Sequence, residues 1–144
     1  MNLITEREVA DKCMCSKVRC AARAVTRVYD TSMRPSGLRA TQMSVLVAIA
    51  AEGAMSITAL AEYLGMDRST LTRNLRPLEN NGLVSLGSEG WRRSRTLSIT
   101  KKGAERLRKA MPYWERAQKK LRDALGVTNW SDAVRSLDHL GRIS

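Results

Sequence analysis

The sequence predicts a mainly α-helical fold with one small β-hairpin, and three observations support this prediction. Apolar residues recur at intervals of three and four along most of the chain, which is the spacing of a helix face. Two short strand-like segments flank a polar turn that contains glycine. Phe is absent and Trp and Tyr number three each, so the core must consist mainly of aliphatic residues and Met, which suits packed helices. The 144 residues are enough for one domain with a real core.

A long N-terminal helix is predicted from Thr5 to about Ser32. Thr5 and Glu8 have the spacing of a capping box, in which each side chain accepts a hydrogen bond from the other residue's backbone N–H. An apolar seam with heptad-like spacing follows, formed by Met14, Val18, Ala21, Val25 and Val28. The segment Arg34-Pro-Ser-Gly37 ends this helix.

Two shorter helices are predicted next. Thr41 is expected to cap a helix that ends near Gly53. One face of that helix is formed by Met43, Leu46, Val47 and Ala50. Ser56 is expected to cap a third helix over residues 57–64, which Gly65 ends.

Residues 68–81 have the pattern of a helix with two different faces, and Asp67 can cap its start. One face is apolar at helical spacing, with Leu71, Leu75 and Leu78. The other face is polar near its N-terminal end, with Ser69, Thr70, Thr72, Arg73 and Asn74. In a helix-turn-helix, this end of the second helix reaches base edges in the major groove of DNA. Residues 68–81 are therefore the candidate recognition helix.

A β-hairpin is predicted after this helix, with strands near residues 83–86 and 96–99 and its tip at residues 87–94. Three helices and a two-stranded hairpin in this order make a winged helix-turn-helix. We place this DNA-binding part at residues 38–100, within a single domain that spans residues 1–144.

Two helices are predicted after the hairpin. Thr100 is expected to cap a long helix, with a bend at Pro112 and an end at Gly126. Polar Gln118 interrupts its apolar seam, which consists of Ala104, Leu107, Met111, Trp114, Leu121 and Leu125. The last helix, over residues 130–140, has one apolar side formed by Trp130, Ala133, Val134, Leu137 and Leu140.

The two terminal regions, residues 5–34 and 101–144, lie outside the winged helix-turn-helix and carry these apolar seams. An exposed apolar seam needs a partner, and the simplest partner is a second copy of the chain. We therefore expect a homodimer in which these regions form the helical dimerisation region. The alternative is that both seams pack against the chain's own core.

The charge of the chain favours an anionic partner. The formal net charge is +11, and the sequence pI is near 10.3. Between residues 67 and 109, eleven Lys and Arg residues stand against four Asp and Glu residues, a net charge of +7. Because most of the excess surrounds the candidate recognition helix, we expect double-stranded DNA as the partner. A generally basic protein without this specificity is the alternative.

Nothing in the sequence indicates export or a membrane. Residues 1–10 carry charges and lack an apolar run, and the longest apolar run, residues 45–51, is too short to span a bilayer. We therefore expect a cytoplasmic protein with no membrane partner, in which the three cysteines are reduced thiols.

Cys13, Cys15 and Cys20 are candidate redox sensors. On a regular helix Cys13 and Cys15 lie about 200° apart and cannot share a metal ion. Cys13 and Cys20 share a face but stand about 10 Å apart, too far for a disulfide. A later helix start, bonding between subunits and inert thiols are the alternatives that remain.

The chain does not have the residue pattern of an enzyme. It has one histidine, and no Ser/His/Asp arrangement, phosphate-binding glycine loop or paired-carboxylate site is recognisable. We therefore expect no catalysis, no cofactor and no metal site. A thiol-dependent enzyme that uses Cys13 or Cys15 is one alternative function, and a non-specific winged-helix nucleic-acid-binding protein is another.

Two motifs carry a resemblance to a known family. The first is residues 60–84, LAEYLGMDRSTLTRNLRPLENNGLV, and the second is residues 93–103, which include LSITKKG. With these motifs, residues 15–140 resemble the MarR family of bacterial transcriptional regulators. The resemblance implies a homodimer with its recognition helices in successive major grooves of a pseudo-palindromic operator and its wing tips in the minor groove. It further implies a repressor released by a small molecule or by oxidation.

Arg73 is the first candidate for a base contact, because its fork matches O6 and N7 of guanine, a pairing worth about 1–3 kcal/mol of discrimination. A contact to phosphate alone is the alternative. The other candidate DNA-binding residues of the helix are Arg68, Ser69, Thr70, Thr72, Asn74 and Arg76. The family's wing usually has an Asp two residues before an Arg. Here Trp91 stands in place of the Asp before Arg93, so Arg92, Arg93 and Arg95 are expected to contact phosphates less selectively.

The resemblance also implies an apolar pocket between the DNA-binding part and the dimerisation region. A small aromatic effector would bind there. The candidate lining residues are Tyr29, Met33, Met43, Val47 and Trp114. Ordinary core packing is the alternative for these side chains.

Overall fold

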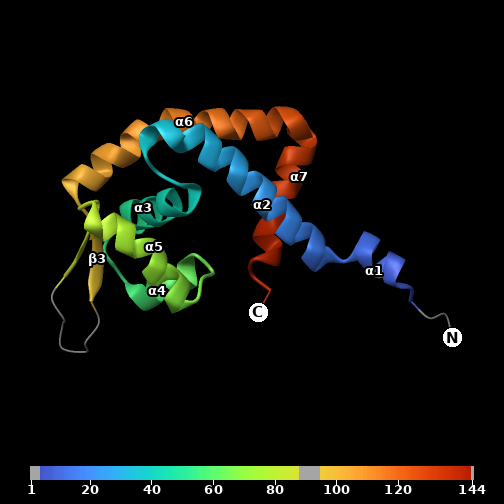
Figure 1. Ribbon diagram of the computed structural model, residues 1–144, viewed down its shortest axis with the longest axis horizontal. Coiled ribbons are helices and arrows are strands. Elements are labelled where there is room, and N and C mark those ends of the chain that lie inside the picture. The colour runs from blue at the N-terminus through green and yellow to red at the C-terminus, as the bar shows by residue number, and fades with distance from the viewer. Residues whose placement is uncertain (1–3, 88–94, 144) are drawn as a thin grey trace.

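The computed structural model describes residues 4–87 and 95–143, and it confirms a mainly helical fold with a small sheet (Figure 1). Its elements in chain order are α1 (Glu6–Lys12), α2 (Met14–Met33), the short 3-10 helix η1 (Arg34–Ser36), α3 (Ala40–Glu52), β1 (Met55–Ser56), α4 (Ile57–Tyr63), α5 (Arg68–Asn80), β2 (Val84–Leu86), β3 (Thr96–Ile99), α6 (Lys101–Leu125) and α7 (Val127–Leu140). In Figure 1, α3, α4, α5 and the strands form one small unit. The helices α2, α6 and α7 extend away from this unit, and α1 lies at the far end.

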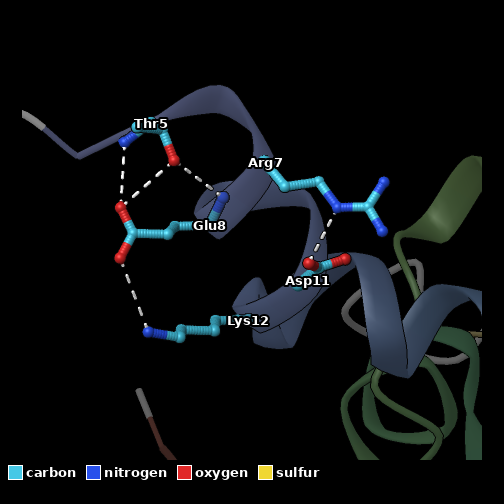
Figure 2. A network of polar contacts seen from close by, with 5 residues as sticks. All are labelled: Thr5, Arg7, Glu8, Asp11 and Lys12. Carbon is cyan, nitrogen blue, oxygen red and sulfur yellow. Dashed lines mark hydrogen bonds and ion pairs between the residues drawn. The ribbon is translucent and has the colours of Figure 1, made fainter.

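The N-terminal region consists of two helices, so the prediction of one helix from Thr5 to Ser32 is wrong. Cys13 is extended, with φ −63° and ψ 110°, and it separates α1 from α2. The predicted capping box is confirmed: the Glu8 amide donates to Thr5 Oγ1 at 3.3 Å, and the Thr5 amide donates to Glu8 Oε2 at 3.1 Å (Figure 2). The bond from the Thr5 amide, and then one that the Thr5 hydroxyl donates to Glu8 Oε2 at 3.2 Å, lower the pKa of Glu8.

Among the described residues, local interactions hold α1 in its helical form. Arg7 pairs with Asp11 at 3.0 Å and Lys12 with Glu8 at 3.7 Å, all on the exposed surface (Figure 2). Such exposed pairs contribute little to stability. No residue of α1 is buried, so this helix does not pack on the core of its own chain.

The core lies where α3 meets the helix-turn-helix and the sheet. Its largest fully buried side chains are Met33, Val45, Leu46, Ile49, Leu60, Leu71, Leu78 and Leu97. The helix α3 begins at Ala40, so the prediction that Thr41 caps it is wrong. Asp30 Oδ1 accepts a hydrogen bond from the Ala40 amide at 2.7 Å, and Gln42 Oε1 accepts one from the Arg39 amide at 2.9 Å. The first of these acceptors belongs to α2, which therefore fixes where α3 starts.

The sheet has the strand order β1-β3-β2, with antiparallel neighbours. β2 and β3 confirm the predicted hairpin strands, and Val84 stands opposite Ile99. The two-residue strand β1, in which Met55 pairs with Leu97, was not predicted.

The junction between β3 and α6 is tightly packed. Thr100 caps α6 as predicted: its Oγ1 accepts from the Gly103 amide at 3.0 Å and donates to the Gly82 carbonyl at 2.7 Å. Gly103 lies so close to the chain before β2 that a Cβ placed there would be 2.0 Å from the Leu83 carbonyl oxygen. A glycine is therefore required where α6 starts.

The C-terminal helices complete the extended part of the molecule. α6 continues through Pro112 and changes direction along its length in Figure 1. Gly126, with φ 79°, ends α6 as predicted, and α7 then begins at Val127, three residues earlier than predicted. Within the described residues, no helix is both long and apolar enough to cross a membrane.

Candidate nucleic-acid interface

The helix α5 has the two faces that the sequence predicts. Leu71, Leu75 and Leu78 are buried, at 0%, 2% and 1% exposure, and fix one face on the core. Ser56 caps the preceding helix α4 by accepting from the Ala59 amide at 3.1 Å, and Gly65, with φ 61°, turns the chain between the two helices. The turn and the three leucines together set which side of α5 faces solvent.

Asp67 organises the N-terminal end of α5. One of its oxygens, Oδ1, accepts from the Thr70 amide at 2.8 Å and from the Ser69 hydroxyl at 2.5 Å. The other, Oδ2, accepts from the Thr70 hydroxyl at 2.7 Å. These hydrogen bonds, led by the one from the Ser69 hydroxyl, hold the pKa of Asp67 well below its usual range. The carboxylate therefore stays charged and keeps both hydroxyl groups in place.

The Asp67 network changes what Ser69 and Thr70 offer to a partner. Both hydroxyl hydrogens are donated to Asp67 and are therefore not free to be donated to a partner. The Thr72 hydroxyl is also engaged, because it donates to the Arg68 carbonyl at 2.8 Å. The oxygens of Ser69 and Thr70 can still accept a hydrogen bond from an incoming amino group.

The cations of α5 lie on the same exposed side. Arg68, Arg73 and Arg76 are exposed, and none of them forms an ion pair within the described part of the chain. Arg73 makes one long contact, from Nη2 to Thr70 Oγ1 at 3.4 Å. Asn74 is half-buried, and its amide nitrogen contacts the Met66 sulfur at 3.7 Å. The arginines are thus available to an anion, while Asn74 is partly used within the fold.

The predicted wing contacts fall in two groups. Arg92 and Arg93, together with Trp91, lie outside the described residues. Arg95 is exposed directly before β3. The strands β2 and β3, on either side of the predicted wing, follow α5 directly along the chain.

A cavity of about 460 Å³ lies between α2, α3 and α6. All five predicted pocket residues line it: Tyr29, Met33, Met43, Val47 and Trp114. Ala40, Ser44 and Met111 complete the lining, and none of the eight residues is charged. Burial raises the pKa of Tyr29, so its hydroxyl stays protonated. Met111 could have been included from the sequence, because it lies three residues before Trp114 on the same helix face.

The three cysteines lie in the N-terminal region, and all three are free thiols. The break at Cys13 corrects the geometry assumed for a regular helix, because Cys13 lies between two helices and only Cys15 and Cys20 belong to α2. Polar contacts from the backbone and then the side chain of Ser16, at the start of α2, lower the pKa of Cys13. In the described residues no group of three His, Cys, Asp or Glu side chains has the arrangement of a metal site.

Comparison with known proteins agrees with this geometry. The family model described as the MarR family matches residues 38–85. The uncharacterized HTH-type transcriptional regulator YwoH of Bacillus subtilis is 27% identical over 90 residues. That alignment covers 62% of this chain and 66% of YwoH, just under two thirds of its length.

Solved structures extend the comparison to nearly the whole chain. The M. tuberculosis transcriptional regulator MosR, in a crystal structure with DNA, is 36% identical, with a TM-score of 0.81 over 91% of this chain and 95% of MosR. BpsR of Bordetella bronchiseptica, a protein whose DNA binding is regulated by 6-hydroxynicotinic acid, has a TM-score of 0.83 over 99% of this chain and 100% of BpsR. At 18% identity, the likeness to BpsR is one of fold alone.

Proposed function

This chain belongs to the MarR family of transcriptional regulators, and from that premise we propose that it is a sequence-specific repressor that binds a pseudo-palindromic operator as a homodimer. The exposed side of α5 is the observation that carries the proposal. It presents three arginines, which form no ion pair with any described residue, beside two hydroxyl oxygens that Asp67 holds in place. Such a surface suits the major groove, where base edges offer hydrogen-bond acceptors and donors and the phosphate backbone is negatively charged.

Within this interface, Arg73 is the residue we assign to a base. Its guanidinium can reach O6 and N7 of a guanine, and the oxygens of Ser69 and Thr70 can accept from the amino group of cytosine or adenine. Arg68, Thr72, Asn74 and Arg76 would position the helix through phosphates or neighbouring bases. The wing residues Arg92, Arg93 and Arg95 would enter the minor groove, where narrow A·T-rich segments concentrate negative potential.

A competition experiment tests sequence-specific binding against the non-specific alternative. Genomic fragments would be bound by the purified protein in the presence of excess bulk DNA. We expect a small set of fragments to be retained after bulk DNA has removed the rest. Equal displacement of all fragments would support the non-specific function and contradict ours.

The proposed homodimer rests on the apolar faces that the single chain leaves open. No residue of α1 or α7 is buried. On α7, Val127, Val134 and Leu137 are exposed to 75%, 50% and 56%. A second copy that covers this face would hold two copies of α5 on one duplex, with half-sites about 34–36 Å apart.

Sedimentation at micromolar concentration tests this interface. Leu137→Glu would place a charge in the apolar face of α7, and we expect it to yield a single subunit. Thr128→Glu is the matched control, because Thr128 lies on the opposite side of the same helix, and this variant should remain a dimer. A monomeric parent, or a dimeric Leu137→Glu variant, would exclude this interface.

For release from DNA by a ligand, we propose the cavity between α2, α3 and α6. It joins the small DNA-binding unit to the long helices, so an occupant can change their relative position. Its lining is uncharged and includes three methionines, which adapt to irregular apolar ligands. We therefore propose an uncharged aromatic effector, because a buried carboxylate would lack a partner.

A pair of ligands that differ in charge tests this proposal. Benzamide should release the protein from DNA more effectively than benzoate. The variant Val47→Trp should abolish that difference, and the control variant Ala51→Trp should retain it.

A second route of release, by an oxidant, rests on Cys13. It lies at the junction of α1 and α2 with a lowered pKa, and Cys15 follows two residues later. Peroxide would oxidise one thiolate to a sulfenic acid, and a second thiol would displace water to form a disulfide. DNA release by peroxide in the parent but not in Cys13→Ser or Cys15→Ser would support this route. A response unchanged in all the serine variants, Cys20→Ser included, would exclude the thiols.

A further inference from the structure

A second concave surface shares no lining residue with the apolar cavity. It has a volume of about 540 Å³ between η1 and α6 and is lined by Arg34, Ser36, Arg106, Lys109 and Tyr113, among others. Three of its lining residues are cations, and none is an acid. We refer to it as the η1–α6 cleft.

The turn after α2 holds Arg106 in this cleft. Arg106 Nη1 donates to the Ser36 carbonyl at 3.2 Å, and a Cβ on Gly37 would lie 2.8 Å from that nitrogen. Gly37 also has φ 72°, a conformation that favours glycine. The turn satisfies its own polar groups, because the Ser36 hydroxyl donates to the Met33 carbonyl at 2.7 Å and accepts from the Leu38 amide. Arg106 is thus positioned by a neutral carbonyl, and most of its N–H donors remain for a ligand.

The cations of the cleft are not paired with an acid in the described part of the chain. Arg34, Arg106 and Lys109 form no ion pair there, although five other ion pairs occur along helices α1, α6 and α7. Asp30 lines the neighbouring depression with Arg34 and Arg39, but its carboxylate accepts a hydrogen bond from the Ala40 amide. Glu105 is four residues before Lys109 and does not pair with it.

The position of the cleft separates it from the DNA-binding surface. η1 packs against α6, and α3 lies between α6 and α5 (Figure 1). An anion in the cleft would therefore be remote from the recognition helix. Tyr113 adds an aromatic wall, and Arg116 stacks on its ring at 4.5 Å, which adds a fourth cation nearby.

From these observations we propose that the η1–α6 cleft binds a small phosphoanhydride, such as pyrophosphate or the polyphosphate group of a nucleotide. Two arginine forks and an ammonium group match several phosphate oxygens at once, whereas a single carboxylate would leave cations unpaired. The volume is that of a small-molecule site rather than of an extended polymer groove.

Calorimetric titration of the full chain with pyrophosphate, at constant ionic strength, tests the site. We expect saturable binding by the parent and at least about tenfold weaker binding by the double variant Arg34→Gln/Lys109→Gln. The matched control is Arg108→Gln/Lys120→Gln, which removes the same charge from exposed positions of α6 outside the cleft and should bind as the parent does. Arg106→Lys keeps the charge but loses the fork, and its affinity should fall between those of the parent and the double variant.

Parallel titrations distinguish the sources of phosphate. Inorganic phosphate should bind more weakly than pyrophosphate, and a nucleoside triphosphate should bind at least as well. Equal losses in the two double variants, or no saturable binding by the parent, would overturn the proposal. It would also fail if the cleft variant lost affinity for a DNA duplex relative to the control variant, because the cleft would then belong to the DNA interface. Unfolding temperatures of all variants establish that each chain is folded.

Discussion

Asp67 shows how one side chain prepares the surface that we propose contacts DNA. It caps α5 and also holds the hydroxyl groups of Ser69 and Thr70. Because its pKa is lowered in the folded chain, the stabilisation from this cap is complete above the ordinary pKa of aspartate. It is lost only as the pH falls toward the lowered value. The N-terminal end of α5 therefore keeps one arrangement throughout the neutral range.

Arg73 is the residue whose loss should reduce sequence specificity most clearly. Arg73→Ala should weaken binding to the operator by roughly 1–3 kcal/mol and binding to scrambled DNA by much less, because a bidentate contact to guanine is lost. Titration of both duplexes at the same salt concentration measures the difference. Arg76→Ala, which removes a charge further along α5, serves as the control and should weaken both duplexes alike. Equal losses on the two duplexes for Arg73→Ala would mean that Arg73 contacts only phosphate.

The reactivity of the Cys13 thiol should depend on pH in a way that reflects its lowered pKa. Since polar contacts with Ser16 lower its pKa, the thiolate of Cys13 should form at lower pH than that of an ordinary cysteine and react faster at neutral pH. Alkylation by iodoacetamide, measured across pH on variants that retain one cysteine each, tests this. A midpoint for the Cys13-only variant that equals the ordinary pKa of a cysteine thiol would contradict it.

At the scale of elements, the sequence predicts best where a boundary depends on neighbouring residues. Four predicted helix caps are present, and in each the side chain accepts a hydrogen bond from the amide three residues later. The capping residues are Thr5, Ser56, Asp67 and Thr100. The start of α3 could not be found this way, because Asp30, ten residues earlier, accepts the Ala40 amide. Nor could β1, since two residues carry no periodicity and pair with a strand about 40 residues later.

The break at Cys13 has a different cause. The apolar seam begins only at Met14, so periodicity carried no information on the residues before it. The capping box at Thr5 indicated a helix start but not where that helix ends. Helical spacing predicted the two faces of α5, whereas the lining of the cavity was expected from the resemblance to the MarR family. The Asp67 network was not, because its hydroxyl partners depend on side-chain conformations.

The close packing at the junction of β3 and α6 should make the stability of the fold depend on Gly103. Gly103→Ala should destabilise the fold by about 1–3 kcal/mol or more, because its Cβ would meet the Leu83 carbonyl oxygen at 2.0 Å. Urea unfolding measures the change. Lys101→Ala, at an exposed position of the same helical turn, is the control and should leave stability nearly unchanged. Unaltered stability of Gly103→Ala would show that α6 does not pack this closely on the chain before β2.

At the scale of the molecule, the basic charge determines how binding responds to salt. Each phosphate that the protein neutralises lowers the slope of log affinity against log salt concentration by about 0.9. We expect a steep negative slope for the parent and a slope reduced by about one unit for Arg76→Gln. Affinity that stays constant between low and moderate salt would contradict an interface built on phosphate contacts.

Selection of duplexes from a random pool by the purified protein directly tests whether the chain binds a specific DNA sequence as a dimer. Two copies of the chain, joined through the exposed faces of α1, α2 and α7, would present two copies of α5 to one duplex. The selected sequences should therefore contain two inverted half-sites, with their centres about one helical turn apart. A single half-site without symmetry, or no enriched sequence at all, would contradict a dimeric, sequence-specific repressor.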